Sequence, residues 1–181
     1  MSKSETIGVF AKNSRGLTVL QDMRWGLIPA SFTGFPESWD ASTSHARIET
    51  VAELVSFKTA WAKKKRVIVP LDRITQKAAG SAMFGGHSKN KVRVAVTRAD
   101  KKPLGVAGIY DYAQTAEGPI LSFAVLTREP GPRMAEIHDR EPVVIEPEQF
   151  QAWLDGADDL GLEKPWPDDA FEVAAVTKAN S

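Results

Sequence analysis

The sequence contains no cysteine. Without thiols the chain can form no disulfide bond, no thiolate zinc site and no cysteine nucleophile. The three histidines, His45, His87 and His138, are far apart in the sequence and show no metal-ligand spacing. We therefore predict neither a metal site nor a bound cofactor.

The sequence also lacks an excess of charge of either sign. Lysine plus arginine number 23, and aspartate plus glutamate number 23, so the net charge is zero. Such a balance produces no overall field that would draw the protein to nucleic acid or to a membrane. Anion binding must therefore depend on local clusters of positive side chains.

Long apolar segments are absent as well. No run approaches the length of a transmembrane helix, and the N-terminus carries no apolar segment of a secretory signal. These absences predict a cytoplasmic protein without membrane contact. Hydrophobic residues make up 43% of the 181 residues, enough for a sizeable core, and we expect a single domain over residues 1–181.

Alternating and β-branched segments predict several strands. The expected strands cover residues 7–12, 17–27, 66–71, 92–99, 104–112, 121–127, 143–145 and 171–176. The first two are separated by turn residues and are expected to form a hairpin. The strands at 92–99, 104–112 and 121–127 are joined by short turns, which predicts an antiparallel meander.

Two segments are expected to be helical. A Thr-x-x-Glu capping box at Thr50 and Glu53, followed by apolar residues at helical spacing, predicts a helix that ends in the basic run 63–66. This run either complements the helix macrodipole or forms a phosphate-contacting patch. Residues 147–155 predict a second, short helix. Residues 31–43 are expected to form a loop, and residues 72–90 either a loop or a distorted hairpin. Together these elements predict an α+β fold, with a mostly antiparallel sheet or barrel-like β core and a few packed helices.

The segment 137–145 places histidine, aspartate and arginine at His138, Asp139 and Arg140. A short helical turn at 133–137 precedes it, and a buried strand follows. Side chains on such a junction can be held in a cleft by rigid neighbours. The alternative is a surface turn with a solvated charge cluster.

Four segments in order resemble the SRAP (SOS-response-associated peptidase) family, which binds single-stranded DNA and senses abasic sites. They are residues 23–29 (MRWGLIP), 46–53 (ARIETVAE), 106–111 (VAGIYD) and 137–143 (IHDREPV). The pair at 126–127 and the helix with Phe150, Trp153 and Leu154 also match, so the resemblance runs from about Ile7 to the C-terminus. It implies a SRAP-like α+β fold.

The resemblance also implies a covalent chemistry. Family members begin with Met-Cys, and removal of the methionine exposes a cysteine that traps the aldehyde of an abasic site as a thiazolidine. An asparagine, a glutamate and a histidine support the reaction. In this sequence the cysteine is absent, the segment before the Arg-Trp-Gly motif is shorter, His45 replaces the asparagine and Gln76 replaces the glutamate. Of the supporting set, His138 remains.

These replacements limit the chemistry. A thiazolidine requires sulfur and is excluded; if Met1 is removed, the amine of Ser2 can still form a Schiff base or its hydroxyl an oxazolidine. Gln76 cannot act as a general base, because an amide does not titrate usefully. His138 either shuttles protons or hydrogen-bonds neighbouring backbone, and His45 is either a compensating acid–base group or a loop residue.

The resemblance further indicates residues that hold DNA. Arg47 and Arg140 form a plausible clamp, because arginine binds phosphate through two parallel hydrogen bonds. Trp25 offers a stacking face for a base, or is a core tryptophan if Arg24 points outward. Thr127 and Arg24 complete the set of predicted DNA-binding residues.

Three hypotheses follow. The first is a SRAP-like protein that binds single-stranded, abasic or otherwise damaged DNA non-covalently and has lost enzyme activity. The second is a protein-interaction module, of phage or mobile-element origin, that binds a host protein through the loop aromatics Phe32, Phe35 and Trp39. The third is an active enzyme with a site rebuilt from His45 and His138, which requires those side chains to share a cleft. A continuous basic groove through Arg47, Arg140 and 63–66 would favour DNA, and an apolar patch around Phe35 and Trp39 would favour a protein partner.

Overall fold

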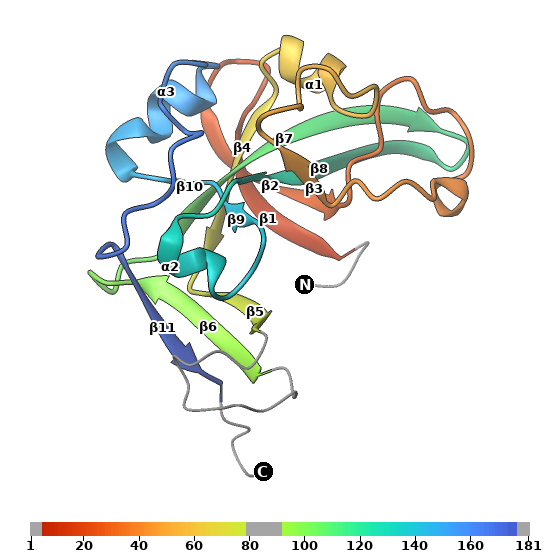
Figure 1. Cartoon of the computed structure of the whole chain (residues 1–181). Helices are drawn as coiled ribbons and strands as arrows, with labels where there is room; N and C mark the ends of the chain where they lie inside the picture. The colour runs from red at the N-terminus through yellow and green to blue at the C-terminus, as the bar shows by residue number, and fades with distance from the viewer. Residues whose placement is uncertain (1–4, 79–91, 177–181) are drawn as a thin grey trace, which may run out of the picture.

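The computed structural model of the chain describes residues 5–78 and 92–176 (Figure 1). Its centre is a closed β-barrel in which strand order runs β7-β4-β1-β2-β8 and a further pairing joins β7 to β8. The barrel strands are β1 (Thr6–Lys12), β2 (Thr18–Trp25), β4 (Arg66–Leu71), β7 (Leu104–Thr115) and β8 (Gly118–Arg128). The predicted hairpin of the first two strands is confirmed, with Lys12 opposite Thr18.

Three short strands extend the barrel sheet. β3 (His45–Arg47) pairs with β8 in parallel, β9 (Glu141–Pro142) pairs with β8 antiparallel, and β10 (Val144–Ile145) pairs with β7 antiparallel. β2 also runs parallel to β8. The β core is therefore mostly antiparallel, with its parallel pairings at one edge of β8.

A second, three-stranded sheet lies below the barrel in Figure 1, in the order β11-β6-β5. Its strands are β5 (Ile74–Ala78), β6 (Val92–Arg98) and β11 (Phe171–Ala175). Two expectations are wrong here. β6 does not continue into a meander with β7, because β4 occupies one edge of β7 while β10 and β8 occupy the other. Of the loop and the distorted hairpin expected for residues 72–90, the loop is wrong, because the segment contains β5, which pairs antiparallel with β6. Its residues 79–90 lie outside the described residues.

The helices are short: α1 (Lys58–Ala62), α2 (Pro132–Ala135) and α3 (Phe150–Leu154), with 3-10 turns η1 (Pro36–Ser38) and η3 (Pro147–Gln149). The helix expected from Thr50 begins only at Lys58. Residues 50–57 form turns instead, in which Thr50 O accepts from the N–H groups of Glu53 and Leu54. These turns bury the side chains of Val51 and Phe57. Tertiary packing of this kind can outweigh the helical propensity of a short segment. Within the described ranges, no helix is long and apolar enough to cross a membrane.

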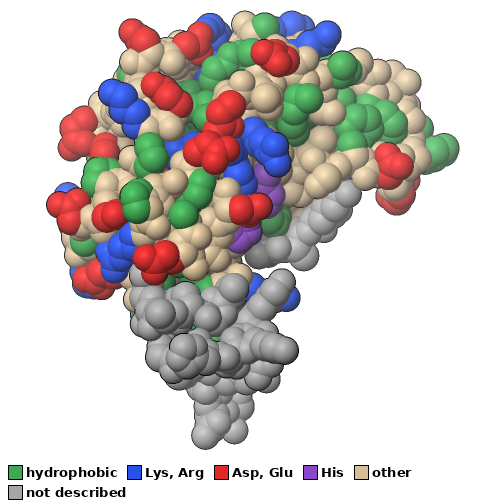
Figure 2. Space-filling view, in the orientation of Figure 1, with side chains coloured by type: hydrophobic (Ala, Val, Ile, Leu, Met, Phe, Trp, Pro, Cys, Tyr) green, Lys and Arg blue, Asp and Glu red, His purple; other side chains and the backbone are tan. Residues whose placement is uncertain are grey.

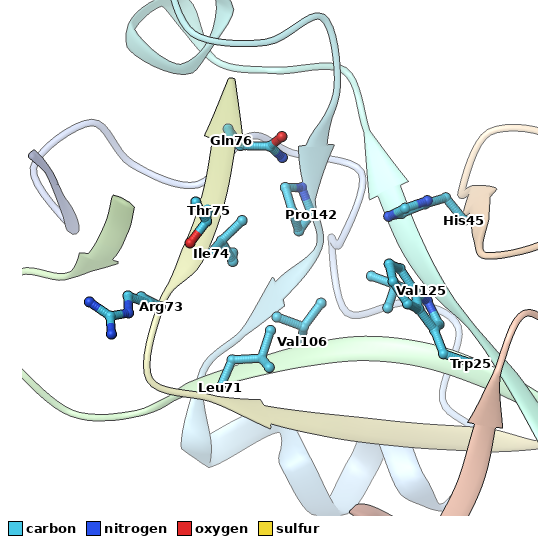
Figure 3. A pocket seen from close by; sticks show the side chains of 10 residues that line it. All are labelled: Trp25, His45, Leu71, Arg73, Ile74, Thr75, Gln76, Val106, Val125 and Pro142. Atoms are coloured by element: carbon cyan, nitrogen blue, oxygen red, sulfur yellow. The ribbon is translucent and has the colours of Figure 1, made fainter. Parts of the chain in front are cut away.

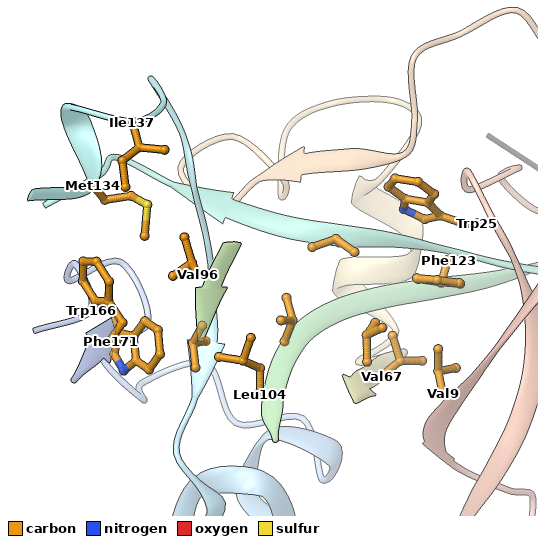
Figure 4. Close-up of a cluster of buried hydrophobic side chains, with 14 of the residues drawn as sticks. Val9, Trp25, Val67, Val96, Leu104, Phe123, Met134, Ile137, Trp166 and Phe171 are labelled. Atoms are coloured by element: carbon orange, nitrogen blue, oxygen red, sulfur yellow. The ribbon is translucent and has the colours of Figure 1, made fainter. Parts of the chain in front are cut away.

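Two clusters of buried side chains hold these elements together. One fills the barrel interior and continues into the second sheet, from Val9 and Phe123 to Val96 and Phe171 (Figure 4). The other packs the outer face of the barrel against the α1 and α3 segments, where Trp153 is fully buried and donates to Val67 O at 2.9 Å. The predicted α+β class with a barrel-like β core is thus confirmed.

Candidate functional site

One edge of β8 brings together residues that are distant in the sequence. Trp25 lies opposite Phe123, His45 opposite Val125, and Arg47 opposite Thr127. Positions two residues apart on a strand face the same side of a sheet. Trp25, His45 and Arg47 therefore follow one another along a single face.

The chain can change strands along this edge because of Gly26. Its φ of 104° lies in a region that favours glycine, so β2 ends directly after Trp25. The intervening loop is tied to the barrel, since Ile28 N–H donates to the buried Ser122 Oγ at 2.8 Å and Leu27 N–H donates to Thr43 O at 3.2 Å. His45 then enters beside Trp25, with the two rings edge-to-face at 5.4 Å between centroids.

Two adjoining cavities lie on this face, and they share His45, Gln76 and Pro142. The Trp25 cavity has a volume of about 280 Å³ and is lined by Trp25, His45, Leu71, Arg73, Ile74, Thr75, Gln76, Val106, Val125 and Pro142 (Figure 3). The Arg47 cavity has a volume of about 360 Å³ and is lined by His45, Arg47, Gln76, Thr127, His138, Arg140 and Pro142. Strand β5 of the second sheet supplies the wall opposite β8.

The structure thus brings together every predicted site residue except Arg24. Arg24 alternates with Trp25 on β2 and lines a separate hollow with Tyr112, and its Nη1 donates to Gly26 O at 3.0 Å. Ser2 and His87 lie outside the described residues. Trp25 itself is 8% exposed, so it is both a core residue and part of the cavity wall.

Arg140 is held by an internal network. Its Nη2 donates to both carboxylate oxygens of Glu49, at 3.0 and 2.7 Å, and Nη1 donates to Glu129 at 2.7 Å. The same guanidinium donates to the backbone oxygen of Thr127 at 2.9 Å and to its hydroxyl at 3.4 Å. Two carboxylates therefore compensate the charge of this arginine.

Arg47 differs from Arg140 in this respect. Its side chain is exposed and, within the described part of the chain, makes no hydrogen bond or ion pair. Because its guanidinium has no internal partner there, it can donate to a phosphate without breaking an existing contact. Of the two predicted clamp arginines, Arg47 is thus the one whose donors are available.

The two described histidines share the Arg47 cavity. Burial, and second the charge of His138, lower the pKa of His45 below its usual range, although the ring remains reachable by solvent. His138 Nδ1 lies 2.8 Å from Asp139 Oδ1 and accepts the backbone N–H of Arg140 at 3.0 Å. Both contacts involve the same ring nitrogen, so they fix the orientation of the His138 ring in the cavity wall. The contact with Arg140 N–H agrees with the alternative in which His138 hydrogen-bonds neighbouring backbone.

Gln76 stands opposite His45. Figure 3 shows the amide and the imidazole directed toward one another from opposite walls, with Pro142 between them. In the described part of the molecule, the amide has no hydrogen-bond partner. It offers both donors and an acceptor to a ligand, but no proton transfer.

The basic run 63–66 does not extend this site. Lys64 pairs with Asp158 and Lys65 with Asp111, while the buried Arg66 donates to Asp158 at 2.8 Å. Arg66 also lies over the rings of Trp61 and Trp153, at 3.8 and 4.8 Å from the centroids, and burial lowers its pKa to about 10. These contacts engage three of the four cations of the run, Lys64, Lys65 and Arg66, and leave only Lys63 for a phosphate patch there. In Figure 2 acidic side chains lie beside the histidines and the neighbouring basic side chains, so the basic side chains on this face do not form a continuous band.

The loop aromatics are only partly exposed. Phe32 and Trp39 pack edge-to-face at 5.1 Å, whereas Phe35 is 60% exposed.

Among the described residues, no group of three or more metal-binding side chains is present.

The sequence did not reveal the apolar lining of the Trp25 cavity. Leu71, Ile74, Val106 and Val125 come from four different strands, and apolar residues in strands usually belong to the core. The one usable signal is the alternation of Phe123, Val125 and Thr127, which predicts a common face.

A protein-family model described as "SOS response associated peptidase (SRAP)" matches residues 1–180. The chain is 30% identical to the abasic site processing protein YMR114C of Saccharomyces cerevisiae, over 75% of this chain and 35% of that protein. It is 29% identical to the abasic site processing protein YoqW of Bacillus subtilis, over 76% of this chain and 62% of the relative. The chain thus spans less than two thirds of these relatives. A solved structure from Bordetella bronchiseptica superposes with a TM-score of 0.82 at 29% identity, covering 98% of this chain and 86% of that one.

Proposed function

Because the chain belongs to the SRAP family, we propose that it binds single-stranded or abasic DNA non-covalently through the Arg47 and Trp25 cavities. The observation that carries this proposal is Arg47, an exposed cation without a partner among the described residues, at the mouth of a cavity shared with His45, His138 and Gln76. A strand phosphate would accept hydrogen bonds from Arg47. The lack of cysteine in this sequence supports a non-covalent mode, because a thiazolidine ring contains sulfur.

The non-covalent part of the proposal follows from the donors present. Gln76 does not titrate, and His138 is engaged through Nδ1 with the backbone of Arg140. These groups hold a ligand by hydrogen bonds and do not form a base–nucleophile pair. With no net charge, and with only one of the two predicted clamp arginines available, affinity should be modest and should fall with salt.

The test uses labelled single-stranded DNA with and without one abasic site, run on native and denaturing gels with and without borohydride. Wild type should shift both on the native gel alone. Arg47→Ala should weaken the shift by roughly tenfold, the scale of a charge-assisted hydrogen bond. Arg15→Ala, which removes the same charge from the β1–β2 turn outside both cavities, should leave the shift unchanged.

A borohydride-dependent band on the denaturing gel would contradict the non-covalent reading and point to an amine, Ser2 or a lysine. Absence of any shift at low salt would contradict DNA binding. That outcome would favour the second candidate, a protein partner, for which the 60% exposure of Phe35 is the supporting observation. Phe35→Ser would then abolish the partner's binding.

A further inference from the structure

The walls of the two cavities differ in chemistry. Around the Trp25 cavity, Leu71, Ile74, Val106 and Val125 present aliphatic side chains. Around the Arg47 cavity, Arg47, Thr127 and His138 present polar groups. A ligand that filled both would need an apolar, ring-sized part joined to an anionic part.

The shared residues lie where these two parts would meet. His45 packs against the Trp25 ring, and Pro142 lies between His45 and Gln76 in Figure 3. The Gln76 amide offers donors and an acceptor, without a partner among described residues, as the edge of a nucleobase requires. The lowered pKa of His45, caused first by burial, favours a neutral imidazole that can lie against a base.

We propose that the two cavities form a subsite for one unstacked, base-bearing nucleotide of a single strand, with the base in the Trp25 cavity and its phosphate on Arg47. The proposal rests on the proposed function and names its preferred ligand. A base buries apolar surface against Leu71 and Ile74, the partly exposed members of the aliphatic wall, and hydrogen-bonds Gln76. An abasic sugar reaches the same phosphate contact but leaves the aliphatic wall uncovered, so the site prefers intact nucleotides to abasic ones.

Each cavity is near the lower limit of small-ligand pockets, at about 280 and 360 Å³. One base and one phosphate therefore match the space better than a longer stretch of strand. The remaining nucleotides of the strand would lie outside, which agrees with modest overall affinity. Arg73 lies at the rim and is directed away from the cavity in Figure 3, so it does not compete for the base.

The experiment compares a short thymidylate oligomer with an oligomer of equal length whose sugars are all base-free tetrahydrofuran units. The two carry the same phosphates, so fluorescence anisotropy isolates the contribution of the bases. Wild type should bind the base-bearing oligomer roughly tenfold or more tightly, the scale of one stacked base. Gln76→Leu should reduce that preference, and Ile74→Trp, which fills the cavity from β5, should abolish it while base-free binding persists.

Leu20→Trp, on the exposed face of the β1–β2 hairpin, controls for the added indole and should keep the preference. Equal binding of both oligomers, each weakened by Arg47→Ala, would overturn the subsite and leave the proposed function standing. Binding of neither would overturn both. Thymidine 5′-monophosphate tests whether the site takes a free nucleotide or one within a strand. If it displaces the oligomer at equal nucleotide concentration, the result supports the nucleotide pocket but contradicts a single strand as its ligand.

Discussion

The guanidinium of Arg140 contacts both carboxylate oxygens of Glu49 through Nη2, at 3.0 and 2.7 Å, although the residues are far apart in the sequence. The pair joins the segment after β3 to the segment before β9, and Glu129 adds a second carboxylate. The Arg140 side chain is 13% exposed and that of Glu49 37%. Arg140 therefore serves to fix the rim of the Arg47 cavity, while Arg47 remains available to an anion.

Arg140→Ala should consequently lower the stability of the protein, whereas Arg47→Ala should leave it nearly unchanged. Loss of Arg140 leaves Glu49 and Glu129 without their cation, so the free energy of unfolding should fall by about 1–2 kcal/mol, discounted from a buried pair because both carboxylates are partly exposed. Loss of Arg47 breaks no contact among the described residues and should change stability by less than about 0.5 kcal/mol. Urea unfolding measures both. Equal destabilisation by the two substitutions would contradict this assignment.

Glu49→Gln should release Arg140 toward a ligand. The amide keeps the size of the side chain but loses its charge, so the cavity rim becomes more positive by one unit. DNA affinity should rise a few-fold, and its logarithm should fall more steeply with the logarithm of salt concentration.

Fluorescence anisotropy over a salt series checks this prediction. Glu53→Gln makes the same change on an exposed side chain that lines neither cavity, and it should behave as wild type. If Glu53→Gln tightens binding as much as Glu49→Gln, the effect is one of overall charge and not of Arg140.

Much of the site was predictable from local patterns and from the family resemblance. The β1–β2 hairpin and the short helix expected over 147–155 both follow from the sequence nearby. Several residues indicated by the resemblance, including Arg47, His138 and Gln76, line one cavity. These patterns do not indicate which partner each side chain contacts.

The errors share a physical cause: which strands pair, and which charged side chains form ion pairs, depends on segments that are distant in the sequence. A short turn after residue 98 suggests that β6 pairs with β7, but both edges of β7 are taken by other strands. The ion-pair partners of Arg140, Glu49 and Glu129, follow β3 and β8, and no local spacing indicates them. Residues 50–57 satisfy helical spacing, yet packing of Val51 and Phe57 favours turns.

Glu141→Gln should be among the more destabilising single substitutions at the site. Glu141 is 1% exposed, and its carboxylate accepts from Arg128 Nε at 2.8 Å and from the backbone N–H groups of Trp166 at 2.8 Å and Gly131 at 3.2 Å. Neutralising it leaves a buried arginine without its anion, a change that costs about 3–5 kcal/mol in comparable pairs.

Chemical denaturation should show this loss, with Glu148→Gln, an exposed neighbour, as the control that leaves stability unchanged. Because Pro142 follows Glu141 and lines both cavities, base-bearing DNA should also bind more weakly. A stability change below about 1 kcal/mol would show that the carboxylate is not required as the buried anion.

The last prediction concerns acid. Burial, and second the charge of His138, place the pKa of His45 in the folded protein below the usual value of about 6.5. As the pH falls, the unfolded chain takes up the His45 proton first, so the contribution of this residue to stability is complete above the usual pKa and is lost on acidification through it. His45→Asn should therefore lose less stability than wild type between about pH 7.5 and about pH 5.5 in urea unfolding. His138→Asn removes only the lesser cause, so the dependence should shrink without vanishing. If His45→Asn keeps the full acid sensitivity, the destabilising proton binds elsewhere, and the neutral His45 that we place against the base loses its physical support.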